Sequence, residues 1–511
     1  MPQPFHKPIG FIALLMSCLT LGNTGFLDPI GASPPVEPPT LVREFRGAWV
    51  ATVANIDWPS QPGLSTEQQQ RKLIELVDRA AALHFNAIVF QVRPASDALY
   101  ASELEPWSEF LTGQMGLAPE PFYDPLTFAV EAAHQRGLEL HAWFNPYRAS
   151  HPAGKSQPSS EHVSHRLPQV VRSYGKYQWL DPGEAEAADH SLAVILDVVR
   201  RYDIDGVHFD DYFYPYPIKD EAGKPVPFPD DPSWNKSQQA GNQLDRENWR
   251  RQNVDRFIER TSIEIKAVKP WVKFGISPFG IWQPGVPESI RGFNAYASLY
   301  ADARKWTKEG WLDYLTPQLY WEVESKGQSY PVLLQWWHQQ NVHGRHLWPG
   351  NFTSRVGLKD RLWPAEEIVR QIETTRAQVG ASGNVHFSFQ AIQKNQGKIA
   401  DALIEGPYAQ AALVPASPWL DHPVPPQPVC EWKKEAGSAN TLQLRLSDGK
   451  QPWLWAVQTQ RGGQWQQQVV PGQKSQIPVD RSGQLPTLER IVVTPISRAG
   501  VAGPGIVVAV E

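Results

Sequence analysis

Three carboxylates follow apolar, strand-like runs of the sequence and could carry out chemistry together. Asp210 and Asp211 come directly after the apolar run 206–209, and Glu322 ends a second run, 313–322. Two carboxylates around one bond are the minimum apparatus for glycoside hydrolysis, because one protonates the leaving oxygen while the other attacks or activates water. We expect Asp210 and Glu322 to form this pair, with the order of their roles open. Asp211 is expected to be a supporting or substitute carboxylate.

The direction of the side chains along five predicted strands supports this expectation. Alternation with a period of two separates an apolar face from a polar face on each strand. The polar faces carry, strand by strand, Gln91 and Arg93; Glu139, His141, Trp143 and Asn145; His208, Asp210 and Tyr212; Thr316, Gln318, Tyr320 and Glu322; and His386, Ser388 and Gln390. The apolar faces should pack on helices, so the polar faces should point into a barrel. Unpartnered buried polar groups cost about 1–3 kcal/mol each, which favours a ligand-binding mouth over an inert core.

The candidate substrate-binding residues lie at the ends of these strands or in aromatic loops. They are Arg93, Gln91, His141, Trp143, Asn145, Tyr147, Arg148, His208, Tyr212, Trp282, Gln318, Tyr320, Trp321 and Gln390. Two alternatives stay open. Arg93 and Arg148 could instead form ion pairs with Asp57, Asp210 or Asp211. Glu322 could pair with a base such as Arg93.

A metal site is a weaker interpretation of the same residues. His141, His208 and His386, together with Asp210, could hold zinc. No compact H-x-H or H-E-x-x-H spacing supports this, and His208 is better explained as a neutral hydrogen-bonding partner of Asp210. The acidic pair at 230–231 could bind calcium, but such a pair in a proline-rich loop is typical of a solvated turn. We therefore expect no metal and no cofactor.

The elements that must position these residues are eight strands alternating with eight helices. This order predicts a (β/α)8 TIM barrel, an α/β fold. Strands are expected at 45–54, 86–93, 138–146, 206–215, 272–280, 313–322, 346–352 and 384–392. Helices are expected at 66–83 with Thr66 as the cap, 125–137, 191–202, 247–268, 299–309, 330–342, 364–379 and 397–413. The longest connections follow strands two to six, on the face where such barrels place their sites.

The composition of the 511 residues divides the chain into five segments. They are a signal peptide (1–24), a spacer (25–42), the barrel (43–414), a proline-rich linker (415–428) and a β-sandwich-like module resembling fibronectin type III (429–511). The formal net charge of −5 gives no electrostatic case for binding nucleic acid or an anionic membrane surface. Several of the 21 tryptophans lie in polar or loop-like surroundings and would suit stacking on sugar faces.

The N-terminus resembles a secretory signal. A weakly basic start at His6 and Lys7 is followed by an apolar run, 9–21, that is short for a membrane span. We therefore expect an extracytoplasmic protein. The residues before Cys18 also resemble a lipoprotein-processing site, and lipidation there would be the route to membrane anchoring. Once the signal is removed only Cys430 remains, which excludes an intramolecular disulfide and a cysteine-based metal site.

Six motifs closely resemble the glycosyl hydrolase-like 10 domain of bacterial, mostly exported proteins. They are REFRGAWVATVANIDWPS (43–60), NAIVFQVRPASDALY (86–100), LHAWFNPYR (140–148), DGVHFDDYFYPYP (205–217), GISPFGIW (275–282) and DYLTPQLYWE (313–322). The resemblance covers about 43–415 and implies a barrel glycosidase. One enterobacterial envelope relative hydrolyses peptide-free peptidoglycan glycan strands, which makes that glycan a plausible substrate here. The resemblance does not assign the acid or the nucleophile.

Three functions follow for testing. The first is an exported glycoside hydrolase acting on a polysaccharide, with peptidoglycan glycan as the expected substrate. The second is a non-catalytic glycan-binding barrel protein of the cell envelope, which would bind glycan without releasing reducing ends. The third is metal-dependent deacetylation or hydrolysis, which would be lost on adding a chelator.

Overall fold

The computed structural model describes residues 37–358, 363–433, 441–480 and 485–510. The predicted signal peptide (1–24), with Cys18, and most of the predicted spacer lie outside these ranges. From Thr40 onward the chain forms one compact unit, and all that follows concerns this unit.

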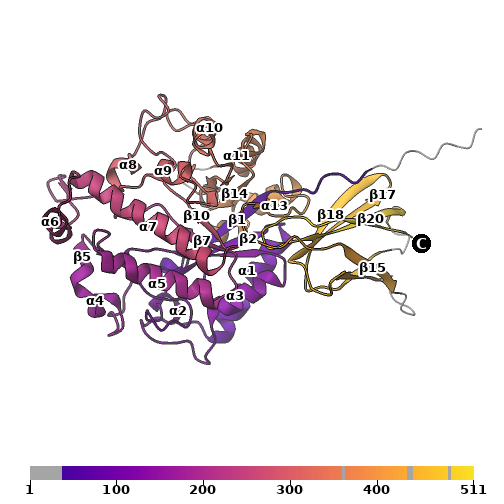
Figure 1. Cartoon of the computed structure of the whole chain (residues 1–511), viewed down its shortest axis with the longest axis horizontal. Coiled ribbons are helices and arrows are strands. Elements are labelled where there is room, and N and C mark those ends of the chain that lie inside the picture. The colour runs from indigo at the N-terminus through magenta and orange to yellow at the C-terminus, as the bar shows by residue number, and fades with distance from the viewer. Residues whose placement is uncertain (1–36, 359–362, 434–440, 481–484, 511) are drawn as a thin grey trace, which may run out of the picture. The chain divides into compact units, whose positions relative to one another are not determined.

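A parallel sheet lies at the centre of the fold (Figure 1). Its strands are β1 (Phe45–Val50), β2 (Ala87–Arg93), β3 (Glu139–Phe144), β7 (Gly206–Phe209), β10 (Lys273–Ile276), β11 (Tyr314–Leu315), β12 (His346–Leu347), β13 (Gly350–Asn351) and β14 (Gly383–His386). The spatial order is β12-β11-β10-β7-β3-β2-β1-β14-β13. The two edge strands, β12 and β13, are separated in the sequence only by Trp348 and Pro349. The sheet therefore curls round until its two edges meet in one segment.

Helices cover the outside of this sheet (Figure 1). The main ones are α1 (Thr66–Ala82), α3 (Pro125–His134), α5 (Ala185–Arg201), α7 (Arg246–Val268), α9 (Ala303–Lys308), α10 (Tyr330–Gln340), α11 (Ala365–Ala377) and α13 (Ile399–Glu405). The cap of α1 is Ser65 rather than Thr66, because Ser65 and Gln68 form a reciprocal capping box. Gly137 follows α3 with a φ of +76°, a conformation that favours glycine.

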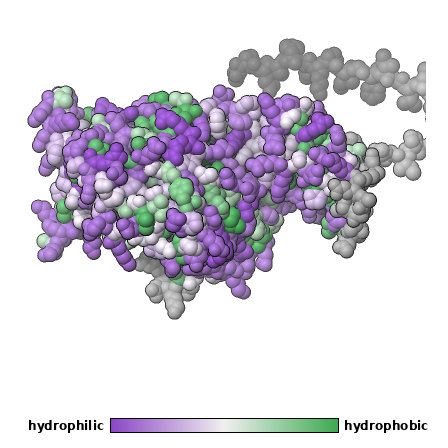
Figure 2. Space-filling model, turned by 90° about the horizontal axis from the view of Figure 1, so that it is seen from below, coloured by the Kyte–Doolittle hydropathy of each residue, from purple (hydrophilic) through white to green (hydrophobic). Residues whose placement is uncertain are grey.

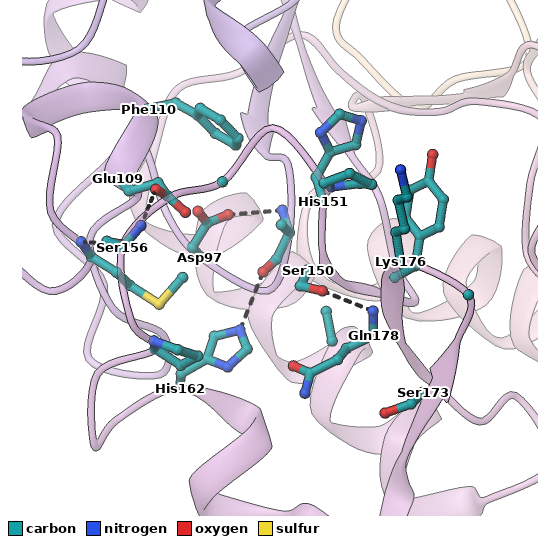
Figure 3. Close-up of a pocket in the computed structure, with 18 residues that line it drawn as sticks. Asp97, Glu109, Phe110, Ser150, His151, Ser156, His162, Ser173, Lys176 and Gln178 are labelled. Atoms are coloured by element: carbon teal, nitrogen blue, oxygen red, sulfur yellow. Dashed lines mark hydrogen bonds between the residues drawn. The ribbon is translucent and has the colours of Figure 1, made fainter.

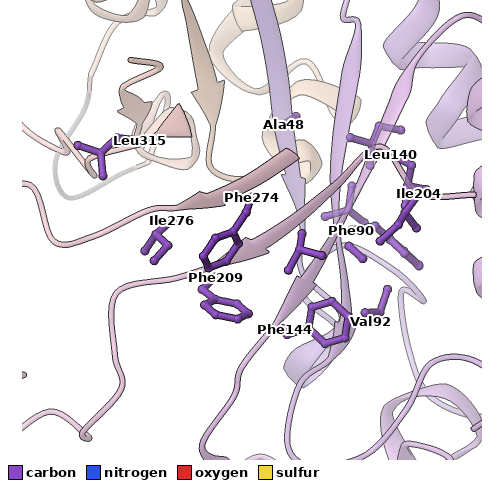
Figure 4. Close-up of a cluster of buried hydrophobic side chains, with 14 of the residues drawn as sticks. Ala48, Phe90, Val92, Leu140, Phe144, Ile204, Phe209, Phe274, Ile276 and Leu315 are labelled. Atoms are coloured by element: carbon purple, nitrogen blue, oxygen red, sulfur yellow. The ribbon is translucent and has the colours of Figure 1, made fainter. Parts of the chain in front are cut away.

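The apolar strand faces pack against the helices, as the alternation predicts. Buried residues of this outer layer, drawn in Figure 4, include Phe90 and Val92 of β2, Phe144 of β3 and Phe209 of β7. A second cluster fills the inside of the curled sheet and contains mainly aromatic and small residues: Phe45, Trp49, Ala51, Ala87, Val89, Trp143, Tyr314, Trp348, Val385 and Val414. The predicted inward faces of β3, β7 and β11 are confirmed, and so is that of β2 as far as Gln91, after which a register shift before Arg93 interrupts the alternation.

The predicted eighth strand is wrong in two respects. The strand ends at His386, and Phe389–Gln393 forms helix α12 instead of continuing it. Its faces are also reversed: Val385 and Phe387 belong to the inner cluster, whereas His386 packs outward against Phe85 and Tyr408. The inside of the barrel is itself apolar here, so the apolar face of the strand points inward.

The loops on one side of the sheet carry short elements that the sequence did not predict. They are α2 (Glu109–Thr112), β4 (Arg148–Ser150), α4 (Val163–Arg166), β5 (Val171–Tyr174), β6 (Tyr177–Leu180), β8 (Ile218–Lys219), β9 (Pro225–Val226), α6 (Asp231–Gln239) and α8 (Ala295–Ser298). Short 3-10 turns occur at Val53–Asn55, Pro168–Val170, Thr353–Arg355 and Gln396–Lys398. Strands β4, β6 and β5 form a small antiparallel sheet.

Two small antiparallel sheets follow the barrel. The strands are β15 (Pro428–Lys433), β16 (Thr441–Leu446), β17 (Leu454–Arg461), β18 (Gln464–Pro471), β19 (Gln476–Pro478), β20 (Leu488–Ile496) and β21 (Ile506–Val508). Their orders are β15-β16-β19 and β18-β17-β20-β21. Side chains from both sheets, including Leu444, Trp455 and Ile491, share one buried cluster. The module is therefore a two-layered β structure.

The outer surface is mixed in character. On the face seen in Figure 2, hydrophobic residues lie in small groups among hydrophilic ones. Within the ranges that the structure describes, no helix combines the length and the apolar character needed to cross a bilayer.

Candidate active site

Asp210 lies directly after β7 and is almost completely buried. Asn145 Nδ2 donates a hydrogen bond of 2.5 Å to Asp210 Oδ2. Burial raises the pKa of Asp210 to about 6, although Arg148, Asn145 and Tyr212 oppose this shift. The other oxygen, Oδ1, has no hydrogen-bond partner among the described residues. Asp210 thus changes its charge near neutral pH and offers a free acceptor.

Asn145 is fixed by its neighbours and in turn fixes Asp210. Its Oδ1 accepts hydrogen bonds from Gln91 Nε2 at 2.7 Å and from Arg148 Nη2 at 2.8 Å. The guanidinium of Arg148 also donates to the hydroxyl of Tyr212 at 2.6 Å. These bonds determine which end of the Asn145 amide faces Asp210, so the carboxylate receives an N–H and not a second oxygen.

Asp211 is the second buried carboxylate at this end of β7. The hydroxyl of Tyr216 donates to Asp211 Oδ2. Burial, followed by the negative charge of Asp210, raises the pKa of Asp211 to about 7. Neighbouring carboxyls that repel each other lose their protons in sequence, so one of the pair tends to hold a proton near neutral pH.

Unpartnered polar atoms from three strands are found at this end of the barrel. Trp143 Nε1, Asp210 Oδ1 and Thr316 Oγ1 are all buried and make no well-formed hydrogen bond among the described residues, although the Trp143 N–H lies close enough to Asp210 to act as a donor and lower its pKa. They come from the inner face of β3, from the end of β7 and from the residue after β11. Native proteins rarely leave such atoms unsatisfied, so a donor and acceptor set of this kind indicates a ligand site.

Glu322 is exposed, in the segment that follows β11. Among the described residues, its carboxylate has no hydrogen bond or salt bridge. The alternative pairing with Arg93 does not occur, because Arg93 is fully buried and its Nε donates to Glu105 at 2.7 Å. Glu322 is therefore accessible to a substrate, whereas Asp210 lies deeper.

The layer beneath the carboxylates is closed and fully bonded. Trp49 Nε1 donates to His208 Nε2 at 3.0 Å, and Ser277 Oγ lies 3.1 Å from the same nitrogen. Burial, with His141 as a second cause, holds the pKa of His208 well below its usual range. His141 contacts Glu139 and Tyr314. His208 is thus neutral, but its contacts are Trp49, Ser277 and Tyr314 rather than Asp210.

Of the three histidines considered for zinc, His141 and His208 share a contact with the Tyr314 hydroxyl, but His386 lies apart from them. His386 faces away from the barrel interior and contacts Thr353 and Tyr408. Within the described part of the chain, no group of three or more His, Cys, Asp or Glu side chains is arranged to hold a metal ion.

Three predicted substrate contacts lie elsewhere. Arg93 has no N–H group left for a substrate, since its guanidinium is bonded to Glu105 and to the carbonyl of Asn145. The alternative ion pair of Arg93 with Asp57, Asp210 or Asp211 is therefore wrong. Tyr147 is buried in the outer layer against Phe257. Gln390, which was assigned to the inner face of strand eight, lies in α12 and donates through Nε2 to the carbonyl of Ile56.

The remaining predicted aromatic residues surround the site at different depths. Tyr320 stacks on Phe352 at 5.0 Å between ring centroids. Trp321 packs against Phe279, and Trp282 donates through Nε1 to Asp302. Gln318 donates through Nε2 to the carbonyl of Ser277 at 3.1 Å. Of these side chains, Tyr320 lies close enough to Asp210 and Asp211 for their charges to raise its pKa, with burial as the main cause.

Three residues of the site were not predicted: Trp49, Tyr216 and Ser277. Trp49 lies on the inner face of β1 with Phe45 and Ala51, and alternation along that strand could have identified it. Tyr216 continues the spacing of two set by Tyr212 and Tyr214. The bond from Ser277 to His208 carries no signal in the sequence, because it joins β7 to the residue after β10, and only the fold makes these two strands neighbours.

Comparison with known proteins gives one consistent result. The model of the glycosyl hydrolase-like 10 family matches residues 44–362. Glycosyl hydrolase YngK of Bacillus subtilis is 41% identical over 414 residues, which are 79% of this chain and 79% of that protein. Glycosyl hydrolase DigH of Escherichia coli K12 is 33% identical over 428 residues, which are 78% of this chain and 95% of that protein.

Among solved structures, the glycoside hydrolase domain of PgaB (BpsB) from Bordetella bronchiseptica is similar. The match covers 71% of this chain and 98% of that chain, with 14% identity and a TM-score of 0.46. The segment matched by the family model contains Asp210, Asp211 and Glu322.

Proposed function

This chain belongs to the glycosyl hydrolase-like 10 family, and we propose that it cleaves peptidoglycan glycan strands outside the cytoplasm. The family and its curated relatives make the chain a glycoside hydrolase, an enzyme that hydrolyses O-glycosidic bonds. Its substrate is accordingly a glycan. The choice of peptidoglycan is supported by the sequence resemblance, and the export by the signal-like N-terminus.

The observation that carries the proposal is the environment of Asp210. A buried carboxyl with a raised pKa, one oxygen held by Asn145 and the other unpartnered, is placed where a barrel presents its chemistry. A merely structural aspartate would have both oxygens bonded. The unpartnered Trp143 Nε1 and Thr316 Oγ1 supply further groups to bind a sugar at the same place.

The roles of the carboxylates follow from their surroundings. The N–H of Asn145 and the positive charge of Arg148 favour the ionised form of Asp210. We therefore assign Asp210 as the nucleophile, or as the base that activates water. Glu322, at the open rim, would protonate the leaving oxygen. Asp211, whose pKa is about 7, is the substitute acid if Glu322 is not required.

The test is digestion of purified, peptide-stripped peptidoglycan by the full chain, with the products identified by mass. We expect new reducing ends and fragments that are shorter than the strands supplied. Binding to the strands without any new reducing ends over a long incubation would contradict the proposal and favour a non-catalytic glycan-binding protein. Retention of activity with chelator present is also expected, and its loss would favour metal-dependent chemistry.

Export can be tested separately from catalysis. We expect the full chain to be found outside the cytoplasm and a chain without residues 1–24 to remain inside. Labelling of Cys18 by a lipid precursor would show anchoring, and its absence would leave the protein secreted or periplasmic.

We also propose that the C-terminal module has a fibronectin type III-like fold. The three-plus-four arrangement of its strands, β15-β16-β19 against β18-β17-β20-β21, supports this. We propose that this module positions the barrel, because Arg498 of the module forms ion pairs with Asp203 and Asp205 of the barrel.

A further inference from the structure

A cavity of about 490 Å³ lies among the loops that follow β2 and β3 (Figure 3). Its lining includes Asp97, Phe110, Ser150, His151, Lys176 and Tyr177. Since β2, β3 and β7 are parallel neighbours, loops that follow β2 and β3 lie at the same end of the sheet as Asp210. The mechanism proposed above uses none of the residues that line this cavity.

Asp97 lies beside the Glu109 carboxylate in the wall of this cavity (Figure 3). It is only 1% exposed. Its Oδ1 accepts a hydrogen bond from the Ala95 N–H at 2.8 Å; its Oδ2 makes no well-formed hydrogen bond among the described residues, although the Ser108 hydroxyl lies close enough to lower the pKa of the carboxyl. A buried acceptor left unsatisfied costs about 1–3 kcal/mol. The cavity therefore contains an acceptor that a ligand with an N–H or O–H group would satisfy.

The opposite side of the cavity is formed by the turn between β5 and β6. Lys176 is exposed in this turn, and among the described residues its ammonium has no hydrogen bond or salt bridge. Tyr177 follows it, and Phe110 provides a second ring. Rings of this kind bind the flat apolar face of a sugar, while an unpaired ammonium attracts a carboxylate. The walls thus combine a hydrogen-bond acceptor, a cation and aromatic faces.

Direct contacts connect the cavity with the active site. Ser150, in its wall, belongs to the same strand, β4, as Arg148, which bonds to Asn145 and Tyr212. The ring of Tyr177 lies 6.3 Å from that of Trp179, and Trp179 lies 5.8 Å from Tyr212. The wall of the cavity is thus linked, through the buried ring of Trp179, to Tyr212 beside Asp210.

We propose that the cavity is a distal subsite for an N-acetylated sugar that carries a carboxylate. Asp97 accepts a hydrogen bond from an amide N–H or hydroxyl of this sugar, and Lys176 pairs with its carboxylate. The inference rests on the proposed function in one respect, namely that this sugar belongs to the strand cleaved at Asp210. The acidic sugar of peptidoglycan, with its lactyl carboxylate, has this chemistry. A glycan strand bound in this cavity is cut at an internal glycosidic bond, at a set distance from the bound sugar.

The test measures binding in a full-length Asp210→Asn background, so that the strands stay intact. Calorimetry compares peptide-free peptidoglycan strands with N-acetylglucosamine oligomers of equal length, which lack the carboxylate. Lys176→Ala should weaken binding of the acidic strands about tenfold, the size expected for one charge-assisted contact. Lys176→Ala should leave the binding of the neutral oligomers unchanged, and Lys176→Arg should restore the binding of the acidic strands. Lys236→Ala, which removes an exposed lysine of α6, is the matched control and should change neither.

Asp97→Asn provides a second variant at the same cavity. It keeps the oxygen that accepts from Ala95 and replaces the unpartnered oxygen by a donor, so both glycans should bind about tenfold more weakly. Thermal unfolding checks that each variant is folded. If Asp97→Asn fails to fold, the comparison of Lys176→Ala with Lys176→Arg still decides whether the cavity binds the acidic sugar.

The outcomes separate this inference from the proposed function. Unchanged binding of the acidic strands by Lys176→Ala and Asp97→Asn would overturn the subsite, even if the wild-type chain cleaves them. An equal loss for acidic and neutral glycans in Lys176→Ala would overturn the carboxylate pairing. Selective loss in Lys176→Ala, in a chain whose wild type binds but never cleaves, would support the subsite and reject the proposed hydrolysis.

Discussion

Strand β7 has buried aspartates at both of its ends, and their surroundings are opposite. Asp205 precedes the strand, and both of its oxygens are bonded: Arg498 Nε donates to Oδ1, and His134 and the Leu140 N–H contact Oδ2. These partners hold the pKa of Asp205 well below its usual range despite its burial. Asp210 follows the strand, keeps one unpartnered oxygen and has a raised pKa.

This difference distinguishes two kinds of buried charge in one fold. A fully paired carboxylate such as Asp205 stabilises the folded chain and joins the barrel to the C-terminal module through Arg498. An incompletely paired one such as Asp210 costs stability, and such a cost is typical of a functional site. Each substitution below alters the barrel at only one of these two ends.

The largest effect is expected for Glu322→Gln. Loss of the proton donor should lower kcat by roughly 10²- to 10⁴-fold, with little change in thermal stability because the side chain is exposed. The matched control is Glu324→Gln, two residues away, which removes only an exposed ion pair with Arg370 and should keep full activity. Similar turnover by the two variants would remove Glu322 from the mechanism and leave Asp211 as the acid.

At the other end of β7, Arg498→Ala should destabilise the chain without affecting the chemistry. It leaves the Asp205 carboxylate buried without its main cation, a change worth about 3–5 kcal/mol. Arg445→Ala removes an exposed pair in the same module and should cost less than about 1 kcal/mol. Denaturant unfolding measures both. A loss of kcat in folded Arg498→Ala would show that the two ends are not independent.

Asp211→Asn should stabilise the chain at alkaline pH. The pKa of Asp211 is about 7 in the folded chain against an ordinary value of 3.8, so folding favours the protonated form. Wild-type stability should fall as the pH rises through this window, and the variant lacks this loss. With about 1.4 kcal/mol per pKa unit, its advantage should be about 2 to 4 kcal/mol at pH 8 and should vanish below about pH 4. An advantage that does not depend on pH would contradict a protonated Asp211.

A smaller effect is expected for Arg148→Lys. Lysine keeps the charge near Asp210 but cannot bond to Asn145, Tyr212 and the carbonyl of Pro94 together. The Asn145 amide would then be held less firmly, and kcat/KM should fall about tenfold, the size of one hydrogen bond of roughly 1.4 kcal/mol. An unchanged kcat/KM would show that charge alone suffices.

Much of the barrel could be predicted from alternation and length. The inward faces of β2, β3, β7 and β11 are correct because their outer faces are uniformly apolar, as packing against helices requires. Strand eight is incorrect because alternation defines two faces without showing which one points inward. In this barrel Val385 packs against inner aromatic residues, while the polar His386 finds partners outside.

The site was predicted where residues act through their own strand and missed where they act across loops. Asp210 and Asn145 follow from register, and the structure joins them by a hydrogen bond. Arg93 shows the limit of this reasoning. A register shift between Gln91 and Arg93 breaks the alternation at the end of β2, and the partner of Arg93, Glu105, comes from a loop whose path the sequence does not specify. Whether a buried charge is satisfied is thus decided by tertiary contacts.

The most direct test exchanges the same atoms at the two ends of β7. Asp210→Asn and Asp205→Asn each replace one buried carboxylate by its amide, and each variant is assayed for release of reducing ends from peptide-free glycan strands and for thermal unfolding. We predict that Asp210→Asn loses turnover while its melting temperature does not fall. Asp205→Asn should have a lower melting temperature but should keep its turnover while it is folded. Turnover retained in Asp210→Asn, or lost in folded Asp205→Asn, would contradict this prediction.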